Sequence, residues 1–211
     1  MSKKKQKSNV REIAETIVIA LVIALFVRSF VVQAFKIPSG SMEKTLLIGD
    51  QLLVNRLSYG IGIEMPLMNR LGRRVIHLST PKRGDVIVFI FPKNRSLDFI
   101  KRVIGLPGEK VEIRERKIYI NDRLIEDPWG HFNSLRPGER DTYGPIMVPP
   151  NSLFVMGDNR DNSEDSRSWG FVPLNNVLGK AVILYWSLDR DRQAPSLLPK
   201  VRWQRIGKLI R

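Results

Sequence analysis

The N-terminal part of the chain contains a long apolar segment without charge. Residues 17–27 are all apolar, and apolar residues resume after Arg28 and Ser29. The segment lacks the 3.6-residue alternation of a helix with one solvated face. A helix over residues 12–35 would exceed the roughly 20 residues needed to cross a hydrocarbon core, with Arg28 extending toward the lipid headgroups. The pattern therefore predicts a transmembrane helix at residues 12–35.

Basic residues precede this segment and predict its orientation. Four lysines lie in the first seven residues, at Lys3, Lys4, Lys5 and Lys7. By the positive-inside rule, residues 1–11 form a cytoplasmic basic tail and everything after Phe35 is exported. Two alternatives remain open: a buried core helix, and a secretory signal cleaved after Val32-Gln33-Ala34. Glu12 and Glu15 fit a cleaved signal poorly.

The rest of the chain contains short runs of β-branched and aromatic residues, separated by Gly and Pro turns. The runs occupy residues 51–54, 85–91, 99–104, 110–113, 117–120, 153–156 and 180–186. This pattern predicts a mostly β, antiparallel domain. We expect residues 36–109 and 150–211 to form its core, and the charged, Pro- and Gly-rich residues 110–149 to form a smaller inserted β subdomain. In residues 200–211, basic residues recur every third position and Trp203 lies among them. This spacing predicts a short amphipathic helix, which either lies in a membrane interface or packs on its own domain.

Composition excludes several kinds of site. The 35 Lys and Arg against 21 Asp and Glu give a net charge of +14, which favours an acidic lipid surface or nucleic acid as partner. No nucleic-acid-binding motif is recognisable, so nucleic acid is not expected. Cysteine is absent, which excludes disulfides and a cysteine nucleophile. His77 and His131 lie far apart in the sequence, and neither is expected to bind a metal.

Two segments contain candidate catalytic groups. Residues 37–42 form a Pro- and Gly-containing turn that presents Ser39 and Ser41, and Lys101 lies beside Arg102 in an apolar run. Neighbouring strand residues point to opposite faces, so one of these two cations is buried or paired if one face is covered. Only lysine can lose its proton there and act as a base. A Ser–Lys pair is thus one interpretation, and a solvated Lys101 on an edge strand is the other.

The third candidate segment is a dense polar loop at residues 157–170. Its carboxylates could suggest a calcium site, but Arg160 and Arg167 are interleaved, and the spacing lacks the glycine and terminal glutamate of an EF-hand. No metal is expected.

Together these segments resemble the type I signal peptidases, or leader peptidases, a family of bacterial serine proteases. The similarity consists of the N-terminal segment and four ordered motifs, at residues 38–46, 83–89, 101–108 and 157–170. It implies a signal-peptidase-like fold without a cofactor, in which Ser41 is the nucleophile and Lys101 the general base. By the same resemblance, Ser39 joins the oxyanion hole and Ser163 orients Lys101. Ion pairs would involve Arg102, Asp158, Asp165 and Arg167, with Arg102 facing Asp158.

The resemblance also implies substrate, location and partners. The substrates would be exported preproteins, cut after Ala-X-Ala-like sites in pockets lined by Phe35, Ile37, Pro38, Met42, Leu46, Phe99 and Ile100. The enzyme would be a monomer in the bacterial inner membrane. Residues 32–34 become a possible self-cleavage site, and Lys44, three residues after Ser41, is a rival base. A cytoplasmic self-cleaving repressor and a non-catalytic, membrane-tethered basic binding protein are the alternatives.

Overall fold

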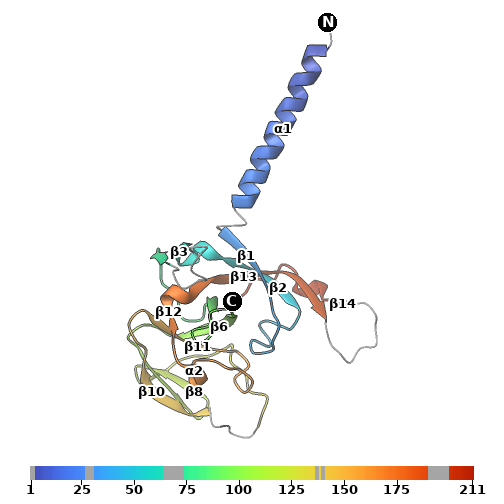
Figure 1. The fold of residues 1–211 in the computed structure, drawn as a ribbon. Helices are drawn as coiled ribbons and strands as arrows, with labels where there is room; N and C mark the ends of the chain where they lie inside the picture. The colour runs from blue at the N-terminus through green and yellow to red at the C-terminus, as the bar shows by residue number, and fades with distance from the viewer. Residues whose placement is uncertain (1–2, 27–30, 64–73, 136–137, 139–140, 190–199) are drawn as a thin grey trace.

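The computed structural model describes residues 3–26, 31–63, 74–135, 138, 141–189 and 200–211 (Figure 1). A long N-terminal helix projects from a body built of β-sheets. All pairings between the named strands are antiparallel. The expectation of a mostly β, antiparallel fold is therefore confirmed.

The N-terminal helix, α1, spans Lys3–Phe26, and strand β1 follows at Val32–Lys36. The predicted helix over residues 12–35 is therefore wrong at residues 32–35, which form a strand, whereas residues 27–30, Arg28 among them, lie outside the described residues. Residues 32–36 pair in register with strand β2, Asp50–Asn55, and this tertiary pairing overrides the helical extension of the apolar run. Large apolar side chains of α1 are exposed, among them Ile17, Leu21 and Ile23. In the described part of the chain, no helix is both long and apolar enough to cross a membrane.

An eight-stranded sheet forms the centre of the body. Its order is β1-β2-β13-β5-β6-β11-β12, with β14 paired to β13. The further strands are β5 (Val86–Ile90), β6 (Asp98–Gly105), β11 (Ser152–Met156), β12 (Val172–Pro173), β13 (Val177–Asp189) and β14 (Lys200–Val201). Strand β5 is apolar and buried throughout, as expected for a strand covered on both faces, whereas β2 alternates buried and half-buried residues.

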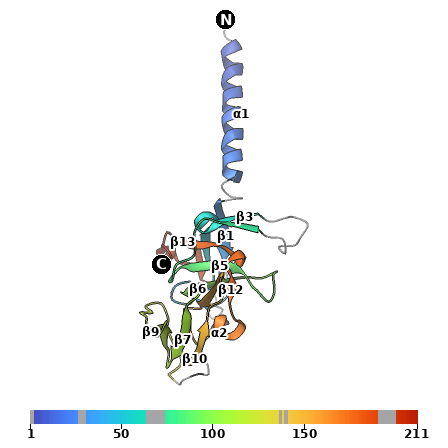
Figure 2. The ribbon, with the colours of Figure 1, turned by 90° about the vertical axis from the view of Figure 1, so that its left-hand side faces the viewer.

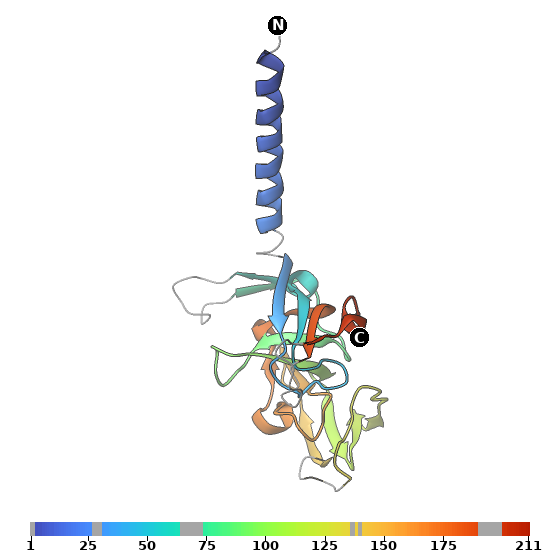
Figure 3. The ribbon, with the colours of Figure 1, turned by 90° about the vertical axis from the view of Figure 1, so that its right-hand side faces the viewer.

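Two smaller sheets adjoin the centre. The order of the four-stranded sheet is β10-β7-β8-β9, with β7 at Lys110–Arg114, β8 at Lys117–Ile120, β9 at Arg123–Leu124 and β10 at Tyr143–Met147. Strands β3 (Gly60–Ile63) and β4 (Arg74–His77) form a separate pair. Figures 2 and 3 show the four-stranded sheet at the end of the body opposite α1. Its strands come from the region expected to be an inserted subdomain; the division of the chain into domains stays a prediction.

The C-terminal residues pack on the central sheet and do not form the predicted amphipathic helix. After β14 comes a single 3-10 turn at Trp203–Arg205, and Leu209 then bridges to Ile183 of β13. The backbone N–H of Ile210 donates to the Val182 carbonyl, and the Ile210 side chain enters the core. Pairing with β13 satisfies backbone groups that a helix would have satisfied internally, so the three-residue spacing of basic residues was misleading.

Candidate active site

Ser41 lies in a tightly turned loop between β1 and β2. The N–H of Glu43 donates to the Gly40 carbonyl and that of Leu46 to the Met42 carbonyl, at 3.0 and 2.7 Å. The side chains of Met42 and Leu46 are fully buried in the core cluster beneath the loop. This apolar packing fixes the loop from below, while Ser41 faces a pocket above it and remains 8% exposed.

Lys101 comes from β6, in the centre of the sheet, and faces Ser41. Its Nζ lies 2.6 Å from Ser41 Oγ, and the side chain is only 4% exposed. Burial lowers the pKa of Lys101 from 10.5 to about 8, against the opposing charges of Asp165, Asp158 and Glu164. Lys101 also lies 5.6 Å from the centroid of the Phe99 ring. A substantial fraction of this amine is therefore neutral near physiological pH.

Arg102, the next residue on β6, lies in a fully buried ion pair. Its Nε and Nη2 donate to the two carboxylate oxygens of Asp158 at 2.8 and 2.7 Å, and both side chains are 0% exposed. Thr45 Oγ1 donates to the same carboxylate at 2.6 Å, and the Arg102 guanidinium stacks 4.5 Å from the Trp129 ring. Because Thr45 belongs to the Ser41 loop, this network ties that loop to β6 and to the loop after β11.

The polar loop that follows β11 is held by a second buried pair. Arg167 Nε and Nη2 donate to the two oxygens of Asp165 at 2.9 and 2.8 Å, and Asp165 also caps the helix α2, Ser166–Trp169. Burial alone would raise the pKa of Asp165, but Arg167 lowers it below its usual range. Ser163 is buried and contributes a hydrogen bond to Asp165. A side chain at Gly157 would clash with Ser163 and with the Ser41 carbonyl, so the loop passes close under the nucleophile.

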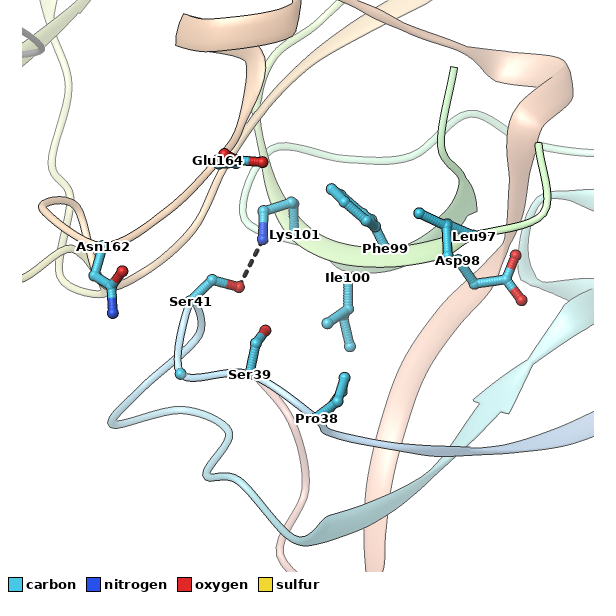
Figure 4. Close-up of a pocket in the computed structure, with 11 residues that line it drawn as sticks. Pro38, Ser39, Ser41, Leu97, Asp98, Phe99, Ile100, Lys101, Asn162 and Glu164 are labelled. Carbon is cyan, nitrogen blue, oxygen red and sulfur yellow. Dashed lines mark hydrogen bonds between the residues drawn. The ribbon is translucent and has the colours of Figure 1, made fainter. Parts of the chain in front are cut away.

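An open pocket of about 530 Å³ lies over the Ser41–Lys101 pair (Figure 4). It is lined by Pro38, Ser39, Gly40, Ser41, Leu97, Asp98, Phe99, Ile100, Lys101, Asn162 and Glu164. In Figure 4 the Ser39 hydroxyl points into the space between Ser41 and Ile100. The pocket thus combines an apolar wall with hydroxyl groups, an amine and two carboxylates.

The residues expected to bind substrate fall into two groups. Pro38, Phe99 and Ile100 line the pocket. Ile37, Met42 and Leu46 lie instead inside the core cluster, against which Phe35 and Ile100 pack. Ile100 belongs to both groups. The other residues of the second group do not line the pocket and pack in the core behind its wall.

Besides Gly40, sequence reasoning did not identify four residues whose side chains line the pocket, namely Leu97, Asp98, Asn162 and Glu164. Asn162 and Glu164 belong to the polar loop already singled out, but nothing in the sequence distinguishes them from their neighbours. Lys44, the rival base, is exposed and lines a different pocket together with Lys208 and Arg211. In the described residues no group of three or more His, Cys, Asp or Glu could hold a metal ion.

A serine hydroxyl in contact with a buried amine, at the base of an open pocket, is chemically suited to nucleophilic catalysis of acyl transfer. The hydroxyl supplies the nucleophile, and a neutral amine supplies the base. No cofactor is needed for this chemistry.

The known proteins to which this chain is similar are signal peptidases. The model of the family described as "Signal peptidase, peptidase S26" matches residues 10–186. A protein named "Signal peptidase I" from Leptolyngbya laminosa is 39% identical over 196 residues, covering 90% of this chain and 86% of its own. "Probable signal peptidase I-2" from Synechocystis sp. is 34% identical over 206 residues, covering 92% of this chain and 84% of its own. A crystal structure of a signal peptidase I from Enterococcus faecalis V583 aligns at 32% identity over 49% of this chain and 98% of its own, with a TM-score of 0.41.

The chain belongs to the signal peptidase family, peptidase S26, and is a serine endopeptidase of the signal peptidase I type that removes signal peptides. The assignment rests on the sequence matches. They give no support to the alternative of a non-catalytic binding protein.

Proposed function

We propose that Ser41 attacks the carbonyl carbon at the end of the signal peptide, and that neutral Lys101 takes the Ser41 proton. The observation that carries this proposal is the 2.6 Å contact between Lys101 Nζ and Ser41 Oγ, both on buried side chains. In the reactive state the Ser41 hydroxyl donates to the unprotonated amine.

The environment of Lys101 makes it a usable base. With a pKa of about 8, about one molecule in ten carries neutral Lys101 at pH 7. An unperturbed lysine would be neutral far more rarely, in about one molecule in several thousand. Lys44 lacks comparable burial and does not line the Ser41 pocket, so it is a poorer candidate.

The reaction proceeds as two acyl transfers with one base. Ser41 Oγ forms a bond to the carbonyl carbon, the C–N bond breaks, and the leaving amine takes the proton that Lys101 received. Water then attacks the Ser41 ester and gives a proton to Lys101. Lys101 passes this proton to Ser41 Oγ as the ester C–O bond breaks, which releases the C-terminal carboxyl group of the signal peptide and restores both Ser41 and neutral Lys101. We assign the Ser41 backbone N–H and the Ser39 hydroxyl to the oxyanion hole and Ser163 to the positioning of Lys101.

The shape of the pocket supports a preference for small side chains. Pro38, Phe99 and Ile100 form an apolar wall close to Ser41, and Ile100 is supported by the core cluster behind it. Small residues before the cleavage site, as in Ala-X-Ala, would fit against this wall without displacing it. We therefore propose cleavage after such sites in exported preproteins.

Membrane attachment through the N-terminal segment is the further part of the proposal. Uncharged apolar residues occupy positions 17–27, the large apolar side chains of α1 are exposed, and lysines precede them. Exposed apolar surface of this extent favours a lipid environment, and the lysines favour a cytoplasmic N-terminus. The protein would then be a single-pass monomer in a bacterial inner membrane, with its β body on the exported side.

The test uses a preprotein with an Ala-X-Ala site and the full-length protein in detergent. Ser41→Ala and Lys101→Arg should each lower the cleavage rate at least about a thousandfold, because nucleophile or base is lost. Lys44→Ala, a matched control in the same loop, should cleave at nearly the normal rate. Cleavage retained by Ser41→Ala or Lys101→Arg, in folded protein, would contradict the assignment.

A further inference from the structure

Glu164 is a charged residue of the pocket that the proposed chemistry does not use. It lies between the buried residues Ser163 and Asp165 in the loop after β11, yet its own side chain is exposed and lines the pocket with Ser41 and Lys101. In Figure 4 Glu164 lies at the Lys101 end of the pocket, whereas Asp98 lies at the opposite end, beyond Phe99. Its two buried neighbours fix the backbone from which it projects.

The charge of Glu164 is available for a ligand, unlike those of the buried carboxylates nearby. Asp158 and Asp165 are each paired through both oxygens with an arginine, Arg102 and Arg167 respectively. Within the described part of the chain, the Glu164 carboxylate makes no hydrogen bond and no ion pair. Its charge acts on Lys101 only at longer range, so a carboxylate without a direct partner lies at the mouth of the pocket in a chain of net charge +14.

We propose that Glu164 determines substrate preference by pairing with a lysine or arginine side chain next to the cleavage site of the preprotein. This inference rests on the proposed function, because it assumes that the preprotein binds over Ser41. The basic side chain would come from the residue between the two small residues, or from the first two residues after the cut. The side chains at these positions do not have to be small.

The pocket offers both features that a long basic side chain requires. Lysine and arginine carry an apolar stem and a charged end, and they bind best where apolar surface lies beside an anion. Phe99 and Ile100 provide the apolar surface, and Glu164 provides the anion. Because the Glu164 side chain is exposed, the attraction is screened by solvent, and we expect a preference of about two- to fivefold.

The experiment uses three pairs of preproteins, one pair for each of the three positions. The two members of a pair differ only by lysine or glutamine at that position. The measured quantity is the ratio of kcat/KM for the lysine substrate to that for the glutamine substrate, at low salt. For the full-length protein we expect a ratio of about two to five for at least one position. Glu164→Gln should bring that ratio to about one, and Glu164→Lys should invert it. Since a changed charge beside Lys101 alters the base for both substrates equally, the ratio isolates recognition of the substrate.

Three controls make the result specific. Glu126→Gln removes the same charge from an exposed residue of another pocket and should leave the ratio unchanged. Raising the salt to about 0.5 M should lower the ratio, because screening weakens exposed ion pairs. Asp98→Asn tests the other carboxylate of the pocket.

Three outcomes would overturn the inference. The first is a ratio near one for the unaltered protein at all three positions, and the second is a ratio that Glu164→Gln leaves unchanged. The third is a preference for lysine that Asp98→Asn removes and Glu164→Gln does not. In each of these cases cleavage of the glutamine substrates would still support the proposed function. Failure to cleave any of the substrates would instead refute the proposed function, and this inference with it.

Discussion

Lys101 shows how one buried side chain links function and stability. Lys101 is only 4% exposed, and this burial lowers the pKa of its amine from 10.5 to about 8. In the unfolded chain the same amine would titrate near its ordinary value. At pH 7 and below, the amine is mostly charged in both states, so folding carries nearly the full cost of burying the charge. The property that favours Lys101 as a base is therefore destabilising.

We predict that Lys101→Met stabilises the protein while abolishing cleavage. Between pH 8 and 10.5 the unfolded chain holds the lysine proton and the folded chain does not, so stability rises with pH across this range. At 1.36 kcal/mol for each pKa unit, removing the charge should add up to about 3 kcal/mol at pH 7. The gain should vanish above pH 10.5. Urea unfolding followed by tryptophan fluorescence at pH 7, 9 and 10.5 measures it.

Lys44→Met is the matched control, because it removes an exposed lysine from the Ser41 loop. It should show no comparable pH-dependent gain. A Lys101→Met protein that is less stable than the unaltered one at pH 7 would contradict the view that burial of the charge is costly.

At the scale of elements, the predicted strands are those with dense β-branched and aromatic residues. The run at residues 85–91 contains β5, and that at 180–186 lies inside β13. Strand β1 was missed because its apolar residues continue an even longer apolar run, and only pairing with β2 separates the two. The C-terminal segment was predicted as a helix because its contact with β13 involves residues far apart in the sequence. Both errors arise where long-range pairing overrides local pattern.

In the candidate site, too, local sequence pattern identifies some residues, and long-range contacts determine the rest. Ser41 and Lys101 could be named because they lie in recognisable motifs, and the structure places them 2.6 Å apart. Glu164 could not be singled out within its loop, because its exposure depends on the buried pair Asp165–Arg167 beside it. The sequence identifies residue types with suitable chemistry, whereas the loops that aim them are determined by tertiary contacts.

The Arg102–Asp158 pair connects β6 with the loop after β11 and, through Thr45, with the Ser41 loop. Its loss should therefore lower the stability of the fold. Asp158→Ala leaves the fully buried Arg102 without a counter-charge and removes the acceptor of Thr45. We predict a loss of about 3–5 kcal/mol in the free energy of unfolding, measured by urea denaturation. The double variant Arg102→Met/Asp158→Leu should recover most of this loss, because it buries no charge. A change below about 1 kcal/mol in Asp158→Ala would contradict the role of the pair as an anchor for the Ser41 loop.

At the scale of the whole molecule, the site depends on segments from both ends of the chain. Arg205, near the C-terminus, donates to the carbonyl of Thr45 and pairs with Asp50 at 2.6 Å. It lies beyond the last residue that the family model matches, residue 186. From the N-terminal side, β1 leads directly into the Ser41 loop, and the N–H of Ile37 donates to the Asp50 carbonyl. Asp50 thus receives contacts from both ends of the chain, and it also accepts a hydrogen bond from the N–H of Leu47 in the Ser41 loop.

The position of β1 predicts that the residues needed for membrane attachment end before the residues needed for folding begin. If residues 12–35 were only an anchor, removing them would leave the β body intact. The structure instead pairs residues 32–36 with β2 and packs Phe35 against the core. A chain lacking residues 1–30 should therefore cleave a soluble Ala-X-Ala peptide within about twofold of the normal rate and lose its binding to lipid vesicles. A chain lacking residues 1–36 should lose at least about 2 kcal/mol of stability through its broken strand pairing, and with it the ordered Ser41 loop. Equal stability and activity of the two truncated chains would show that β1 contributes nothing to the site.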